Sequence, residues 1–169
     1  MEVGQVRGQW AKWANQSSNE TGFMKLRGNY PAKVDEKGRL KIPAQFLEAL
    51  KEYGNQFYIT STTGETARIY PMKVWGEIED RLATMPSTNP AKRKFLMRTS
   101  YYGAVVEIDS QGRVLLPAVL RESAQTKGDV DVLGALDHVE VMNHTRVLDQ
   151  LKSEPYTDED DRALEAWRP

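Results

Sequence analysis

One ten-residue stretch of this chain is written twice, and this repeat limits the possible folds more than any other feature. Residues 34–43 read VDEKGRLKIP, and residues 108–117 read IDSQGRVLLP. The copies lie 74 positions apart and share Asp, Gly, Arg and Pro at the same places. Three further places are apolar in both copies. An internal repeat of this kind indicates one structural unit that is used twice, so we predict a fold built from two related halves.

Each copy has the pattern of two short strands joined by a tight turn. In the first copy apolar and polar residues alternate, which is the period of a half-buried strand. The residues expected to face the core are Ala32, Val34, Leu40 and Ile42. The connection ends at Gly38, and glycine readily adopts the left-handed backbone that closes such a turn. We therefore predict a β-hairpin over residues 29–42, followed by a helix that begins at Pro43.

Alternation and helical spacing organise the rest of the chain in the same way. Strands are predicted near residues 56–60, 67–70, 104–109, 113–116, 130–133 and 139–142. Further helices are predicted to begin near Pro71, Ala91, Pro117, Thr145 and Thr157. The resulting divisions are a disordered N-terminal extension (1–23), a first repeat (24–85), a linking helix (86–101), a second repeat (102–152) and an acidic C-terminal helix or tail (153–169).

Composition excludes several classes of protein. The 169 residues include no cysteine, which excludes disulfide scaffolds and thiolate chemistry and indicates a cytoplasmic location. No apolar run approaches the length of about 18 residues that a membrane span needs. Phosphate-binding glycine loops are absent, and His138 and His144 have no carboxylate partner at metal spacing. We therefore expect no catalysis, no cofactor, no metal and no membrane partner.

The net charge of −1 conceals a gradient along the chain. Residues 25–41 hold six basic and two acidic side chains, whereas residues 153–169 hold two basic and six acidic ones. Such asymmetry indicates an end that faces a polyanion and an acidic tail at the other end. Charged patches also occur on proteins that bind no nucleic acid, so charge alone does not decide between these interpretations.

The repeated Asp and Arg allow two interpretations. Asp35 and Arg39 flank the first turn, where opposed side chains come within reach of each other, so one interpretation is an ion pair that fixes the strand register. The other is DNA recognition, because the arginine fork matches phosphates and guanine edges and a two-stranded ribbon fits the major groove. Three additional cations favour DNA for the first copy, namely Lys33, Lys37 and Lys41.

Four segments give the chain a resemblance to a known family. They are Arg27-Gly28-Asn29-Tyr30, the twin Asp-x-x-Gly-Arg turns at 35–39 and 109–113, Ser87-x-Asn89-Pro90-Ala91, and Leu120-Arg121-Glu122-x-Ala124. On these motifs, over about residues 24–160, the chain resembles the MraZ family of bacterial transcriptional regulators, which are built from two AbrB-like (SpoVT-AbrB) units.

The resemblance implies an α+β fold in which two swapped-hairpin repeats form a small pseudo-two-fold barrel flanked by short helices. It implies sequence-specific binding of double-stranded DNA at repeated promoter elements ahead of the division and cell-wall gene cluster, with repression that includes the chain's own operon. It also implies a ring-shaped homo-oligomer and a cytoplasmic, nucleoid-associated location. By this resemblance Asp35, Arg39, Asp109 and Arg113 occupy the family's motif positions. Together with the charge of the first copy, this gives the DNA-binding residues that we expect: Arg27, Lys33, Lys37, Arg39, Lys41 and Arg113. The residues expected to shape the turns are Asp35, Gly38, Asp109 and Gly112.

The two copies differ in charge. The second has Glu107, Gln111 and Leu115 where the first has Lys33, Lys37 and Lys41. We therefore expect the first copy to supply most phosphate contacts, and the second to be mainly structural or to serve a subunit interface. Two other functions remain open: an antitoxin-like module whose acidic tail meets a partner protein, and a barrel enzyme that uses Asp35 or Asp109 as acid or base.

Overall fold

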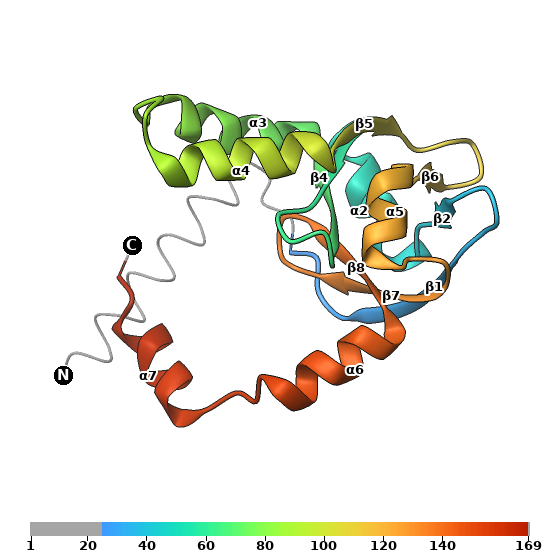
Figure 1. Cartoon of the computed structure of the whole chain (residues 1–169). Coiled ribbons are helices and arrows are strands. Elements are labelled where there is room, and N and C mark those ends of the chain that lie inside the picture. The colour runs from blue at the N-terminus through green and yellow to red at the C-terminus, as the bar shows by residue number, and fades with distance from the viewer. Residues whose placement is uncertain (1–24, 169) are drawn as a thin grey trace.

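The sheet of this protein curves into a barrel-like core to which both halves of the chain contribute (Figure 1). The computed structural model describes residues 25–168, so the predicted extension at 1–23 lies outside the described residues. Its strands are β1 (Asn29–Val34), β2 (Arg39–Lys41), β3 (Gln56–Thr60), β4 (Ala67–Pro71), β5 (Ala104–Glu107), β6 (Arg113–Leu115), β7 (Gly128–Gly134) and β8 (Val139–Asn143). Its helices are α2 (Ala44–Lys51), α3 (Met72–Ala83), α4 (Pro90–Tyr101), α5 (Ala118–Ala124), α6 (His144–Ser153) and α7 (Asp158–Ala166).

The two halves interlock strand by strand. The order in the sheet is β5-β3-β4-β8-β7-β1-β2-β6. Four of the antiparallel pairs, β1–β7, β2–β6, β3–β5 and β4–β8, join one strand of the first half to one strand of the second. The edge strands β5 and β6 meet at the second turn, where the N–H of Asp109 donates to the carbonyl of Arg113 at 2.9 Å. The predicted α+β fold, a pseudo-two-fold barrel of two interlocked repeats, is confirmed.

The predicted hairpin over residues 29–42 is wrong in its extent. β1 and β2 are paired only at Val34 and Leu40. β1 instead pairs over its whole length with β7, and β2 pairs with β6. β2 leaves its sequence neighbour after one pair because the two-fold arrangement places it beside its counterpart from the second half. The alternation still predicts the inner face correctly, since Val34, Leu40 and Ile42 are buried and Ala32 packs against them.

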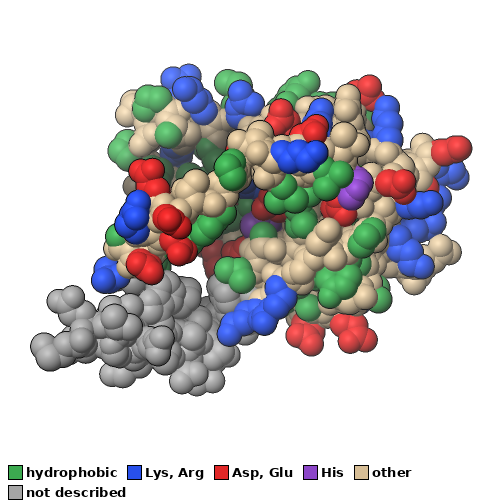
Figure 2. All heavy atoms as spheres, turned by 90° about the horizontal axis from the view of Figure 1, so that it is seen from below, with side chains coloured by type: hydrophobic (Ala, Val, Ile, Leu, Met, Phe, Trp, Pro, Cys, Tyr) green, Lys and Arg blue, Asp and Glu red, His purple; other side chains and the backbone are tan. Residues whose placement is uncertain are grey.

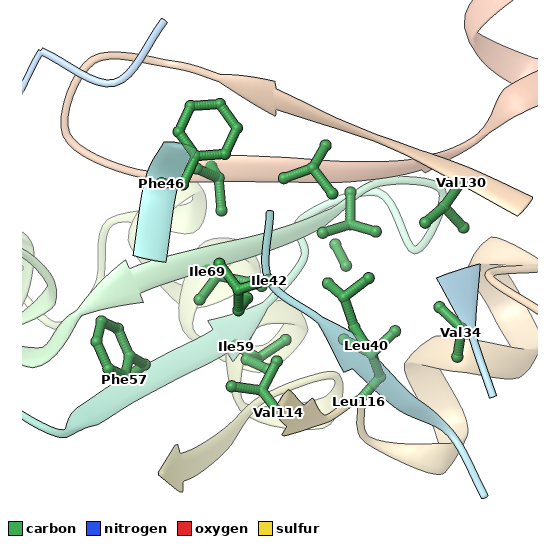
Figure 3. Packing of buried hydrophobic residues seen from close by; sticks show 14 of the residues in the cluster. Val34, Leu40, Ile42, Phe46, Phe57, Ile59, Ile69, Val114, Leu116 and Val130 are labelled. Carbon is green, nitrogen blue, oxygen red and sulfur yellow. The ribbon is translucent and has the colours of Figure 1, made fainter. Parts of the chain in front are cut away.

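Apolar side chains from both halves fill the barrel (Figure 3). The labelled members of this core are Val34, Leu40, Ile42, Phe46, Phe57, Ile59, Ile69, Val114, Leu116 and Val130. α2 buries Phe46 and Leu50, and α5 buries Leu120. Burying one such side chain stabilises the fold by about 1.5–3 kcal/mol, and because the contacts cross between halves, neither half has a complete core alone.

Polar residues and prolines define the helix ends. Pro43 and Pro117, expected as first helical residues, are instead the N-caps of α2 and α5. The side chain of Asn89 caps α4, as its position before Pro90 suggests. α7 follows Thr157, near the predicted start, and has a capping box in which Thr157 and Asp160 bond each other's backbone N–H groups.

Two helical arms extend from the barrel (Figure 1). α3 and α4 form one arm, and α6 and α7 form the other. The first arm is anchored by Trp75, which is buried and stacks on Tyr58 with ring centroids 4.7 Å apart. In contrast, α7 buries none of its residues. No helix among residues 25–168 has the length and apolar character needed to cross a membrane.

Candidate nucleic-acid interface

A single aspartate organises the first repeated turn by accepting three hydrogen bonds. Asp35 Oδ1 accepts the backbone N–H of Lys37 at 3.0 Å and that of Arg39 at 2.9 Å. Its other oxygen, Oδ2, accepts the Nε–H of Arg39 at 2.8 Å. The same carboxylate therefore fixes the backbone of the loop and the direction of the arginine, and charge-assisted bonds of this kind are stronger than neutral ones.

The second turn repeats this geometry. Asp109 Oδ1 accepts the N–H of Gln111 at 2.8 Å and that of Arg113 at 2.9 Å, and its Oδ2 accepts the Nε–H of Arg113 at 3.0 Å. The backbone N–H of the arginine is the main reason why the pKa of Asp35 and of Asp109 lies below its usual value, and desolvation opposes this effect. Both turns therefore contain the ion pair that the motif suggests.

Each turn lies against the helix of the opposite repeat. Gly38 and Gly112 have φ angles of +85° and +75°, which side chains rarely adopt. A Cβ at Gly38 would overlap the guanidinium of Arg121 in α5, and a Cβ at Gly112 would lie 3.0 Å from Leu47 in α2. Leu47 and Arg121 are separated by the repeat spacing of 74 positions. Glycine is thus required at both turns by the backbone angle and by the helix packed beneath.

β2 and β6 form a short antiparallel ribbon, which we call the β2–β6 ribbon, with an exposed outer face. Leu40 pairs with Val114, and both are buried in the core. Because successive side chains alternate between the two faces of a strand, the neighbours of this pair point outward. The outward pairs are Arg39 with Leu115 and Lys41 with Arg113. The ribbon thus presents three cations and one leucine, and each turn fixes the direction of its own arginine.

Both arginines keep one edge of the guanidinium for an external partner. The aspartates engage the Nε edge of Arg39 and Arg113, whose side chains are 32% and 25% exposed. Within the described part of the chain, the Nη groups of these two arginines have no hydrogen bond. An arginine held in one orientation with its Nη groups unoccupied can bind a phosphate oxygen or the edge of a guanine.

Two of the predicted lysines lie at the first turn, and the third lies at the other end of the ribbon. Lys37 is exposed at the tip of the turn, and Lys41 is exposed on the ribbon, opposite Arg113. Lys33 lies on β1 opposite Asp129 of β7, with Nζ 4.0 Å from the nearest carboxylate oxygen. These two side chains are 84% and 79% exposed, and ion pairs at such exposure contribute little. Lys33 can therefore exchange this contact for a phosphate. Basic side chains do gather at the edge of the molecule that bears the turns (Figure 2, right).

The structure separates Arg27 from the other predicted DNA-binding residues. Its Nε donates to the carbonyl of Lys25 at 3.4 Å, and its backbone approaches Gly134 at the end of β7. The six residues of β1 lie between Arg27 and the first turn and span roughly 20 Å. Arg27 therefore lies on a different part of the surface and could meet the same ligand only if that ligand were extended.

Two cations of the second repeat lie beside the first turn and were not predicted from the sequence. Arg121 donates from Nη1 to the carbonyl of Leu116 at 3.1 Å, beneath the turn. Lys127 lies 2.7 Å from Glu122, and both line a groove next to the turn. A signal for Arg121 was present, because it occupies the repeat position of Leu47. No comparable signal marks Lys127.

Both histidines have carboxylate partners in the fold, although the sequence places none at the spacing of metal ligands. His138 Nδ1 lies 2.7 Å from Asp137, and its Nε2 lies 3.2 Å from Glu140. His144 Nδ1 lies 2.6 Å from the buried Asp131, which belongs to a different element and is therefore not evident from sequence spacing. Among residues 25–168 no group of three or more His, Cys, Asp or Glu could hold a metal ion.

Comparison with known proteins also finds two related halves in this chain. The family model described as "MraZ protein, putative antitoxin-like" matches twice, over residues 26–98 and 103–166. A protein of Acidobacterium capsulatum is 54% identical over 140 residues, which cover 82% of this chain and 96% of the relative. One of Koribacter versatilis is 46% identical over 141 residues with the same coverage. One of Moorella thermoacetica is 41% identical over 120 residues, covering 70% and 81%. All three are named Transcriptional regulator MraZ.

The interlocked strands and the twin Asp–Arg turns define a swapped-hairpin barrel of two AbrB-like repeats in one chain. The two matches of the family model and the relatives that span most of the chain narrow this class further. The chain belongs to the MraZ family.

Proposed function

We propose that this chain is a sequence-specific DNA-binding regulator of transcription. The observation that carries the proposal is the outer face of the β2–β6 ribbon, where both repeats present an arginine oriented by an aspartate. Such guanidinium groups suit phosphates and guanine edges, and a two-stranded ribbon fits the major groove. The printed names of the relatives, which are transcriptional regulators, support the same function.

Within this function we propose repression at repeated promoter elements ahead of the division and cell-wall gene cluster, including the chain's own operon. Membership of the MraZ family supports these targets. DNA binding at such sites would make the protein cytoplasmic and nucleoid-associated. Repeated elements also suit a protein that presents several copies of one ribbon, because linked binding events multiply a modest affinity.

We further propose a ring-shaped homo-oligomer in which α7 of one copy packs on α4 of the next. α4 has four basic residues and no acidic one, and it exposes Met97 (71%) and Tyr101 (66%). α7 has four acidic residues in its first turn and exposes Leu164 (65%). Both helices therefore combine apolar side chains with charge, and the two charges are opposite. A chain of net charge −1 would gain affinity for DNA by presenting several ribbons together.

Catalysis by the turn aspartates has little support from the geometry. The side chains of Asp35 and Asp109 are 38% and 39% exposed, and the pKa of each lies below its usual value. A general acid or base works best with a pKa near the operating pH. The lowered pKa of each carboxylate departs from this requirement, and both carboxylates accept hydrogen bonds from the turn itself.

An antitoxin-like interaction module is the second candidate. The exposed acidic helix α7 and the printed description of the family model favour it. The genomic neighbourhood discriminates the two functions: a toxin-like reading frame next to this gene favours the interaction module, and wall-synthesis genes favour the regulator.

The proposed regulator is tested by gel-shift of the full chain on the DNA upstream of its own gene, across a salt series. Binding that weakens steeply with salt is expected, because several phosphate contacts release counterions. Arg39→Ala should weaken it, and circular dichroism should show that this variant is folded. Failure of the wild-type chain to retard its upstream DNA any better than unrelated DNA would overturn the proposal.

A further inference from the structure

We propose that Leu115 determines part of the DNA sequence preference by contacting the methyl group of a thymine in the major groove. This inference rests on the proposed DNA-binding function and assigns a role within the same ribbon. It starts from a break in symmetry on the exposed face.

The outer face of the β2–β6 ribbon is two-fold symmetric at one pair of positions and asymmetric at the other. Arg39 and Arg113 are repeat equivalents and are identical, each with its own aspartate. Lys41 and Leu115 are also equivalents, yet one is a cation and the other is apolar. Each end of the ribbon therefore has one arginine, but Lys41 accompanies Arg113 and Leu115 accompanies Arg39.

Leu115 is placed where an apolar group has few useful partners. It is 55% exposed, lies directly opposite Arg39 and follows Arg113 by two positions on the same face. A phosphate makes no favourable contact with an aliphatic side chain, so the phosphates that these cations would bind give Leu115 no partner. The major groove does offer one apolar group to a protein, the methyl group at C5 of thymine, which also distinguishes this base from the others.

The ribbon geometry also sets the distance between the two contacts. Directly opposed side chains have Cβ atoms about 4.5–5.5 Å apart, and base pairs follow each other about every 3.4 Å. When Arg39 binds a guanine edge or a phosphate, Leu115 therefore faces a base one or two steps away. Lys41 at the other end would reach a phosphate instead, so the symmetric fold would read an asymmetric sequence.

The test uses the full chain and a duplex from the region upstream of its own gene. Each thymine is replaced in turn by deoxyuridine, which removes only the methyl group, and binding is measured by fluorescence anisotropy. For the wild type, at least one replacement should weaken binding about fourfold, the equivalent of one buried methylene-sized group. With Leu115→Ala, that same replacement should have no effect, while replacements elsewhere act as before.

A second variant restores the symmetry of the ribbon. Leu115→Lys supplies the cation that Lys41 provides at the other end, so it should bind more tightly, steepen the salt dependence by about one unit of slope and abolish the thymine effect. The matched control is Leu136→Ala, because Leu136 is 56% exposed and lies between β7 and β8, away from the ribbon. This control should keep the wild-type response to deoxyuridine.

Three results would overturn the inference. The first is a wild-type chain that ignores every deoxyuridine replacement. The second is a Leu115→Ala variant that retains the full response. The third is a Leu115→Ala variant that has the wild-type affinity per protomer for each duplex but forms smaller assemblies in light scattering. That result would assign Leu115 to a contact between subunits. Failure of DNA binding itself is distinguishable, because the wild type would then raise the anisotropy of no duplex.

Discussion

Leu40 and Val114 face each other across the β2–β6 ribbon, and they are the same position of the two repeats. An antiparallel pair of equivalent residues lies on the local two-fold axis of the barrel. Both side chains are at most 1% exposed. The centre of the core and the junction between the halves are therefore the same place, directly beneath the face proposed to meet DNA.

Truncation at this pair should weaken the whole fold. Leu40→Ala is expected to lower the free energy of unfolding by about 2–5 kcal/mol, because it leaves a cavity in a packed interior. Urea denaturation followed by tryptophan fluorescence measures this change. The neighbouring exposed Lys41→Ala should stay within about 0.5 kcal/mol of the wild type. A comparable loss from both variants would show that the ribbon is not centred on the core.

The two arginines should contribute unequally to DNA binding. Arg39→Ala should cost about 1–3 kcal/mol of affinity per ribbon, because Lys33 and Lys37 lie at this turn. Arg113→Ala should cost less. Gel-shift titration at one salt concentration compares them, and thermal unfolding verifies that both variants are folded. Equal losses of affinity would remove the proposed asymmetry between the repeats.

Acid should destabilise the turns. The pKa of Asp35 and of Asp109 is below its usual value of 3.8 in the folded chain. These carboxylates therefore contribute fully to the stability of the fold at pH values above 3.8, and this contribution is lost as the pH falls through their pKa in the folded chain. The double variant Asp35→Asn and Asp109→Asn should have a lower urea midpoint than the wild type at about pH 6 and a smaller loss towards about pH 3. A double variant whose urea midpoint falls towards low pH as steeply as that of the wild type would contradict this prediction.

The cluster around His138 should respond to pH in the opposite sense. Burial lowers the pKa of His138, but hydrogen bonds to Asp137 and Glu140 outweigh this effect, so the net pKa lies above 6.5. Its contribution to stability is then present below pH 6.5 and is lost as the pH rises through the raised value. NMR titration of the His138 ring should give the raised pKa, and Glu140→Gln should lower it. A ring that titrates below 6.5 in the wild type would contradict the cluster.

Charge reversal should test the proposed contact between α4 and α7. Arg93→Glu on α4 and Asp161→Lys on α7 should each shift the chain towards smaller species in light scattering, because each places like charges in the contact. The two changes combined should recover part of the assembly. Glu36→Lys, in the first turn, is the control and should leave the assembly unchanged. Additive losses in the combined variant would argue for a different contact.

The sequence predicts which residues face the core better than it predicts which strands are neighbours. Alternation places Val34, Leu40 and Ile42 inside, and all three are buried. The same alternation cannot show that β2 pairs with β6 after a single pair with β1, because a strand presents the same inner face to either neighbour. The repeat spacing does indicate the pairing of β2 with β6, since it makes Leu40 and Val114 equivalent positions of the two halves.

The candidate site shows a similar limit. The motif itself suggests the ion pair between Asp35 and Arg39, because it lies within five residues of one turn. The packing of Arg121 beneath that turn joins positions more than eighty residues apart, so no local pattern indicates it, and the only signal for its place is its repeat equivalence to Leu47. The separation of Arg27 from the ribbon likewise depends on the direction in which β1 runs through the sheet.

Each turn packs against the helix of the opposite repeat, so the two halves of one chain build the ribbon together. This arrangement affects how the sequence of the exposed ribbon face can change. If the same barrel were made from two identical chains, every substitution would occur twice, and the ribbon could recognise only a palindromic target. Covalent fusion of the halves removes this restriction. Lys41 and Leu115 can then diverge while Leu40 and Val114 continue to close the same core. One continuous chain can in this way keep a symmetric scaffold and yet distinguish the two directions along a DNA duplex.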